Sequence, residues 1–288
     1  MANDREVLRI VWEGQIPVCF QADLNEGNAV RQPENLYLMI PRLSYLPLVT
    51  DKVKKHFSRY VSNDVQEGEV WFDCNGTPLK WHFPIGVLYE LTNRENDDLP
   101  WCITIHFSKF PEEILFRCPN REIVEAHFMS CLKEADVLKH RGQVVSTMQK
   151  KDHNQLWLGL VNDKFDQFWA VNRRLMEPSG DLEGFKYIPI RCYKEDGTYL
   201  QKLIAPTNEN GTKRTVQDLL QDFSSDSLKA GKQDITNVHF KFKYTNNYFI
   251  LMKVEIWFLS LFDSTILGIN DNFRNRNCFL GLEHVELN

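Results

Sequence analysis

The segment Val70-Trp71-Phe72-Asp73-Cys74-Asn75-Gly76-Thr77-Pro78-Leu79-Lys80-Trp81 carries the clearest local fold signal of this chain. Two short runs, 70–74 and 77–81, flank the dipeptide Asn75-Gly76. Asn-Gly is the dipeptide that best tolerates the positive φ angles of a tight two-residue turn. The segment therefore predicts a β-hairpin.

Helix and strand patterns on both sides of the hairpin complete a first module. Before the hairpin we predict a helix at Glu6–Trp12, strands at Ile16–Phe20 and Leu36–Ile40, and a helix at Leu43–Val61. After the hairpin we predict a helix at Pro84–Leu91 and a strand at Trp101–Phe107. This order is consistent with a β-grasp, the ubiquitin-like fold, and also with other α+β folds.

The next part of the chain is predicted to be helical. Residues 121–149 make one or two helices with a break at Gly142, and residues 155–176 make another. The aromatic residues of the second stretch indicate ordinary helix–helix packing. The cluster Pro178-Ser179-Gly180-Asp181 is typical of a boundary.

A third module begins after this boundary with a second strand pair. Phe185–Tyr193 and Tyr199–Ile204 are strand-like, with a turn at Gly197 between them. A short helix is predicted at Thr215–Phe223, and a hydrophilic loop follows at 224–233.

Composition and motifs exclude several classes of function. The formal net charge of −5 and the lack of a basic stripe argue against nucleic-acid binding. Seven cysteines, none spaced as Cys-x-x-Cys, favour free thiols in a reducing cytoplasm. We find no metal-ligand spacing, no phosphate-binding loop and no catalytic elbow, so no metal, cofactor or catalytic residue is expected.

Lys133 is the candidate functional residue. Apolar or small residues recur at steps of four and three residues along one side of its helix: Val124, Phe128, Cys131, Ala135 and Leu138. At 100° per residue, Lys133 lies about 200° from Cys131 and about 200° from Ala135. We therefore expect its amine to point into water, as most surface lysines do.

Four segments closely resemble the autophagy-related protein 5 family: Tyr45–Phe57, Gly76–His82, Glu125–Asp136 and Met148–His153. The resemblance runs from Asp4 to about Gln233. It implies two ubiquitin-like β-grasp modules on either side of a helix-rich module, an α+β architecture. The implied parts are an N-terminal helix at 1–14, a first ubiquitin-like domain at 15–110, a helix-rich domain at 111–180 and a partial second ubiquitin-like domain at 181–233.

The resemblance also implies a function. In the family, the lysine of the Met-Ser-Cys-x-Lys-Glu-Ala-Asp string accepts the C-terminal glycine of autophagy-related protein 12, and this lysine is Lys133 here. The E1-like protein 7 and the E2-like protein 10 deliver that modifier. The conjugate binds autophagy-related protein 16 and acts like an E3 ligase for lipidation of protein 8 homologues. The expected location is the cytoplasm and, peripherally, the growing phagophore membrane.

Two other interpretations stay open at this point. The chain could be a ubiquitin-like adaptor that is never conjugated, or a transferase acting through a thioester on Cys131. The place of Cys131 in the apolar stripe indicates a packed, inert thiol, and neither His127 nor His140 is expected to serve it as a base. Asp136, three residues after Lys133, is expected to pair with its ammonium group.

The chain departs from the family pattern at about Asp234. Residues 234–288 lack the family's Thr-Pro-Leu-x-Trp-Leu helix and final strand, and resemble translated A/T-rich noncoding sequence. We therefore expect a divergent tail, an incomplete second β-grasp, and an isoform impaired in binding protein 16. Tyr248–Ile269 is apolar, but Lys253, Glu255 and Asp263 argue against a membrane span.

Overall fold

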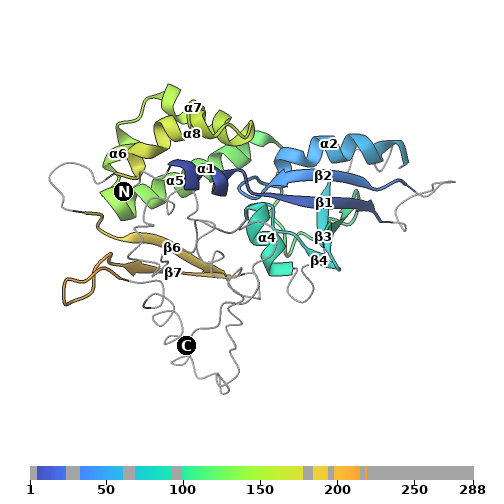
Figure 1. Cartoon of the computed structure of the whole chain (residues 1–288). Coiled ribbons are helices and arrows are strands. Elements are labelled where there is room, and N and C mark those ends of the chain that lie inside the picture. The colour runs from blue at the N-terminus through green and yellow to red at the C-terminus, as the bar shows by residue number, and fades with distance from the viewer. Residues whose placement is uncertain are drawn as a thin grey trace, which may run out of the picture. The chain divides into compact units, whose positions relative to one another are not determined.

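The computed structural model describes residues 5–23, 33–60, 69–92, 99–177, 184–193, 198–214 and Asp218 (Figure 1). The chain divides into two compact units, which we describe separately. One contains residues 10–131 and 154–168, and the other contains residues 1–9, 132–153 and 169–288. The long helix α5 begins in the first of these units and ends in the second.

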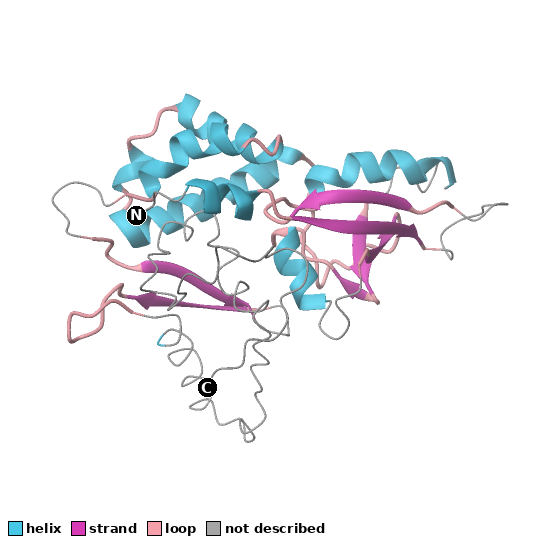
Figure 2. Cartoon of the chain, in the orientation of Figure 1, coloured by secondary structure: helices cyan, strands magenta, loops and turns pink. Residues whose placement is uncertain are grey.

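The unit built on residues 10–131 contains a five-stranded sheet with the order β2-β1-β5-β3-β4 (Figure 2). The strands are β1 (Gln15–Ala22), β2 (Leu36–Pro41), β3 (Trp71–Cys74), β4 (Thr77–Pro78) and β5 (Trp101–His106). β1 is antiparallel to β2 and parallel to β5, and β3 is antiparallel to β5 and β4. The mixed sheet has the parallel pair β1 and β5 at its centre. Together with the order of helices and strands along the chain, this arrangement is a β-grasp, as predicted.

Helices cover the apolar face of this sheet. They are α2 (Pro47–Phe57), which continues into the 3₁₀ turn η1 (Ser58–Tyr60), and α4 (Ile85–Thr92). Ahead of β1, α1 (Arg5–Trp12) instead brings the Trp12 ring against Phe165 and Phe168. Figure 1 shows α2 running along β1 and β2. Val53 and Phe57 of α2 are fully buried, as are Phe20 of β1 and Ile105 of β5. This burial is the main driving force for the module.

The predicted hairpin is present and tight. Asn75 and Gly76 have φ angles of 51° and 78°, which a two-residue turn of this kind requires. Its second strand is shorter than predicted because Pro78 has no N–H to extend the ladder, although Leu79 N–H still donates to Phe72 O at 2.8 Å. α2 likewise begins later than predicted, because Pro47 occupies its first turn.

The helical region contains α5 (Arg121–His140), α6 (Gln143–Ser146), α7 (Lys150–Val161), α8 (Phe165–Asn172) and the 3₁₀ turn η2 (Arg173–Leu175). The break predicted at Gly142 is confirmed, since this residue has a φ angle of 79°. The prediction of one helix over 155–176 is wrong. Asp163 takes a left-handed φ of 52°, Lys164 N–H donates back to Gly159 O at 2.8 Å, and the chain turns into α8.

The other unit contains the antiparallel pair β6 (Ile188–Tyr193) and β7 (Tyr199–Ile204), as predicted. Just before β6, the N–H groups of Lys186 and Tyr187 donate to Lys139 O and Leu138 O, both at 3.1 Å. These bonds satisfy two carbonyl groups at the C-terminal end of α5, which a helix leaves without an internal partner.

Several predictions lie outside the described residues. These are the boundary at 178–181, the turn at Gly197, the helix at 215–223 apart from Asp218, the tail at 234–288 and the apolar run at 248–269. Within the described part of the chain, no helix is both long and apolar enough to cross a bilayer.

Candidate functional site: the exposed face of helix α5

Lys133 is exposed on α5, as the sequence predicts. The buried side of the helix is broader than the predicted stripe. Val124, Phe128 and Ala135 are buried, but Cys131 and Leu138 are only partly covered, and Leu132 is 1% exposed. Lys133 therefore lies beside the buried side and still points away from it.

Five of the exposed residues of α5 form a ribbon that contains Lys133. Its members follow one another at spacings of three or four residues, so they lie on one face of the helix: Glu122, Ala126, Ser130, Lys133 and Val137. Among the described residues, no hydrogen bond or ion pair engages the Lys133 ammonium group. A protein approaching this face would meet the amine without first breaking an ion pair.

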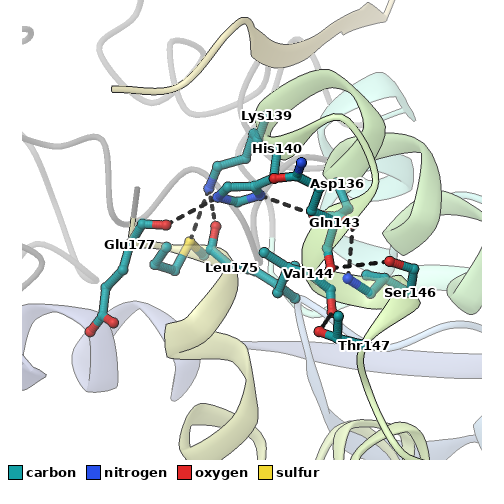
Figure 3. Close-up of polar contacts among 11 residues, drawn as sticks. Asp136, Lys139, His140, Gln143, Val144, Ser146, Thr147, Leu175 and Glu177 are labelled. Atoms are coloured by element: carbon teal, nitrogen blue, oxygen red, sulfur yellow. Dashed lines mark hydrogen bonds and ion pairs between the residues drawn. The ribbon is translucent and has the colours of Figure 1, made fainter. Parts of the chain in front are cut away.

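Asp136 does not pair with Lys133, and that prediction is wrong. Its side chain is fully buried and accepts hydrogen bonds from His140 Nδ1 at 3.0 Å and from the backbone N–H of Val145 at 2.8 Å (Figure 3). His140 Nε2 donates in turn to Glu177 O at 3.1 Å. Asp136 is turned towards His140 because the two residues are four apart on the buried side of the helix.

Lys139 is the second buried charged residue of α5, with no exposed surface. Its ammonium group donates to Leu175 O (Figure 3). It also lies 3.6 Å from Met176 Sδ and 4.2 Å from the centre of the Phe185 ring. Burial lowers the pKa of Lys139 to about 7, and the nearby Asp136 carboxylate opposes this shift. Together, Asp136, Lys139 and His140 join the end of α5 to α6, η2 and the segment before β6.

Glu134, next to Lys133, is held by the β6–β7 pair. Its carboxylate accepts hydrogen bonds from the guanidinium of Arg191 and, at 2.6 Å, from Gln201 Nε2. Arg191 Nε also donates to Gln201 Oε1 at 2.7 Å, which closes the triangle. The backbone that carries Lys133 is therefore fixed on one side by the strand pair and at its end by the buried polar residues.

Cys131 lies close to His127, and the contacts of this histidine show whether it could act as a base. His127 Nε2 is 3.7 Å from Cys131 Sγ, because the residues are four apart on the helix. The same nitrogen lies 3.0 Å from His82 O, and a carbonyl oxygen accepts only from a protonated nitrogen. The nitrogen that faces the thiol is therefore a donor and is unsuited to act as its base.

No catalytic or metal centre emerges from the described residues. Within them, no group of three or more His, Cys, Asp or Glu side chains could hold a metal ion. Sequence reasoning missed the buried set Asp136, Lys139 and His140. The available signal was their spacing, since these residues continue the stripe past Leu132 at steps of four, three and one.

Three family models match most of the chain. Residues 11–107 match the model described as autophagy protein ATG5, UblA domain. Residues 121–178 match its alpha-helical bundle region, and residues 187–270 match its UblB domain.

Individual relatives agree with these matches. Autophagy protein 5 of Drosophila melanogaster is 65% identical over 231 residues, which is 80% of this chain and 86% of the relative. Autophagy-related protein 5 of Caenorhabditis elegans is 36% identical over 230 residues, covering 79% and 82%. The crystal structure of Kluyveromyces marxianus Atg5 has the same fold, with a TM-score of 0.64 at 20% identity over 76% of this chain and 84% of that one.

The third family match bears on the tail. It continues to residue 270, past residue 234, where the sequence analysis places the start of the divergence. The match to the Drosophila protein, in contrast, spans only 231 residues. The origin of residues 234–288 therefore stays a prediction.

Proposed function

Because the chain belongs to the autophagy protein 5 family, we propose that Lys133 accepts the C-terminal glycine of autophagy-related protein 12 in an isopeptide bond. The membership itself gives the chain a role in autophagy as a scaffold. The observation that supports the acceptor role is the exposed amine of Lys133 on a helix whose neighbouring residues are held in place.

A rigid, exposed acceptor suits transfer from an outside enzyme. α5 is an unbroken helix of 20 residues, about 30 Å long. Its C-terminal half is held by the hydrogen bonds of Asp136 and Lys139, and Glu134 is bonded to Arg191 and Gln201. An enzyme that docks on the exposed ribbon finds the backbone of Lys133 in a nearly fixed position, so that only the lysine side chain has to be ordered for the reaction.

The chemistry requires machinery in trans. A lysine ammonium ion is no nucleophile, so a proton must leave before the nitrogen attacks the thioester carbonyl carried by the E2-like protein 10. The carbon–sulfur bond then breaks, the thiol of the E2-like protein leaves, and the amide bond forms. The E1-like protein 7 loads the modifier beforehand. Lys133 is the acceptor in this scheme and the chain itself is not an enzyme.

The conjugate would act through further partners. It binds the N-terminal helix of autophagy-related protein 16 and promotes transfer of protein 8 homologues to phosphatidylethanolamine, as an E3-like factor. The conjugate would work in the cytoplasm and peripherally at the phagophore membrane. Impaired binding of protein 16 follows if the second ubiquitin-like domain is incomplete.

Reconstituted conjugation tests the proposal. The full chain is mixed with the modifier, the E1-like and E2-like proteins and ATP, and a mobility shift is followed on denaturing gels. We expect a shifted band that survives thiol reductant, that is absent in Lys133→Arg, and that persists in Lys150→Arg, a control at another exposed lysine. A band removed by reductant would instead favour a thioester on Cys131, and no band at all would favour an unconjugated adaptor.

A further inference from the structure

Two cysteines face each other on neighbouring strands of the first sheet. Cys19 of β1 and Cys102 of β5 are direct partners in the parallel register. Partners in register point to the same face of a sheet. The amide nitrogen of Gln21 lies 3.8 Å from Cys19 Sγ and 3.9 Å from Cys102 Sγ. Both thiols therefore lie within reach of the same amide nitrogen.

The spacing of this pair fits a disulfide. Neighbouring strands lie about 4.8 Å apart, and the Cα atoms of a disulfide lie about 4.4–6.8 Å apart. Both residues are reduced in this structure. A bond between them therefore requires a rotation of the side chains and no rearrangement of the sheet.

The two thiols differ in access to solvent. Cys102 is exposed at the surface, whereas Cys19 is 2% exposed. A dissolved reagent therefore meets Cys102 first. Cys19 lies next to it, in the position of a resolving thiol, which is the arrangement found at reversible thiol switches.

We propose that Cys19 and Cys102 form a redox-modification site that closes to a β1–β5 disulfide by exchange with a low-molecular-weight disulfide such as glutathione disulfide. In the first step the Cys102 thiolate attacks one sulfur of glutathione disulfide, forms a mixed disulfide and releases one glutathione thiolate. In the second step the deprotonated Cys19 sulfur attacks Cys102 Sγ and releases the second glutathione. Two protein thiols are oxidised, and one glutathione disulfide is reduced to two glutathione molecules.

The environment sets the speed of this exchange. Burial, and next the neighbouring Cys19, raise the pKa of the Cys102 thiol above its ordinary value. The thiolate is the reacting species, so the first step is slow at neutral pH. Its rate rises about tenfold for each pH unit while the thiol form predominates. The site therefore responds slowly, to sustained rather than brief exposure to the disulfide.

Closure of the bond would change one exposed surface of the domain. Cys19 also faces Tyr37 of β2 in register, and Tyr37 is 63% exposed. A disulfide would tie β1 to β5 beside this aromatic side chain and remove the exposed thiol of Cys102. The site thus connects redox state to the open face of the ubiquitin-like sheet.

Non-reducing peptide mapping tests the proposal. The full chain is incubated at pH 8 with glutathione buffers of increasing disulfide content, remaining thiols are alkylated, and digests are analysed by mass spectrometry. We expect a linked peptide pair that contains Cys19 and Cys102, lacks two hydrogen atoms relative to the separate peptides and is separated by reductant. Glutathione retained on Cys102 of the wild-type chain without this link would overturn the proposal.

Two variants sharpen the result. Cys19→Ser should retain glutathione on Cys102, because the resolving thiol is gone. Cys118→Ser, at a partly buried thiol outside the sheet, should keep the Cys19–Cys102 link. Equal glutathione adducts in wild type and Cys19→Ser would also overturn the proposal. The wild-type experiment stands alone if a variant folds poorly.

Discussion

Lys139 combines full burial with a charge that is lost near neutral pH. Between pH 7 and its ordinary pKa of 10.5, the unfolded chain holds a proton that the folded chain has released. Stability contributed by this residue therefore rises with pH across that window, by up to about 1.4 kcal/mol per pH unit. Below pH 7 the buried charge gives its greatest destabilisation.

Replacing Lys139 with methionine tests this account. The variant removes the titrating group and keeps most of the side-chain volume. We expect the variant's gain in stability over wild type to be largest near pH 6.5 and to shrink as the pH rises towards 9.5. Urea unfolding at several pH values, followed by tryptophan fluorescence, gives this difference. A difference that stays constant with pH would contradict the assigned shift.

Each carboxylate oxygen of Asp136 accepts a hydrogen bond in the protein interior. Asp136→Asn places an NH₂ group against either the His140 ring nitrogen or the Val145 N–H, which both donate to the carboxylate. We expect a loss of about 2–4 kcal/mol in stability, because a buried donor or charge is left unpaired. The control is Glu122→Gln, at an exposed residue of the same helix, which should change stability by less than about 0.5 kcal/mol. Equal unfolding midpoints for the two variants would contradict this role.

Exposed and buried charged residues of α5 differ in how well the sequence predicts them. The exposure of Lys133 follows from local helical geometry and could be predicted. The burial of Lys139 and Asp136 could not, because their partners Leu175 and Val145 are fixed only once the chain has folded. Charged residues are almost always exposed, so a sequence pattern alone favours the wrong environment for them.

At the scale of elements, α7 and α8 approach each other closely at Gly159. A Cβ atom at this position would lie 2.8 Å from the backbone nitrogen of Phe168 and 2.9 Å from its Cα. Backbone atoms cannot move aside as a flexible side chain can. The glycine is therefore required by the close approach of the two helices.

Gly159→Ala measures the value of this contact. Alanine favours the helical state by about 1 kcal/mol over glycine, but the clash with the backbone of Phe168 should outweigh this gain. We expect a net loss of about 1–3 kcal/mol in stability. Gly184→Ala is the matched control, since nothing lies within 4 Å of its added Cβ. A stabilised Gly159→Ala variant in thermal unfolding would contradict the close approach.

The elements differ in how much their sequences reveal. The hairpin at Asn75-Gly76 and the break at Gly142 were predictable, because each depends on a local left-handed conformation. The break between α7 and α8 was not, because Asp163 takes its left-handed conformation without a glycine to signal it. The apolar period continued across the break and favoured one long helix.

At the scale of the whole molecule, the proposed binding of protein 16 depends on the second ubiquitin-like domain. A β-grasp without its last helix and strands leaves an apolar face and a sheet edge uncovered. A chimera replaces residues 234–288 with the ending of the Drosophila protein. We expect this chimera to retain the protein 16 helix more strongly in a pulldown than the wild-type chain does. Equal retention by both chains would show that residues 234–288 complete the domain, in agreement with the family match to residue 270.

The acceptor role of Lys133 is the central claim, and site mapping on the conjugate tests it most directly. Wild-type chain is conjugated with the purified modifier and enzymes, digested with trypsin and analysed by tandem mass spectrometry. We predict one dominant branched peptide, with the modifier's C-terminal residues joined to Lys133 and that lysine protected from cleavage. A conjugate whose branch point lies at another lysine, with Lys133 unmodified, would contradict the account.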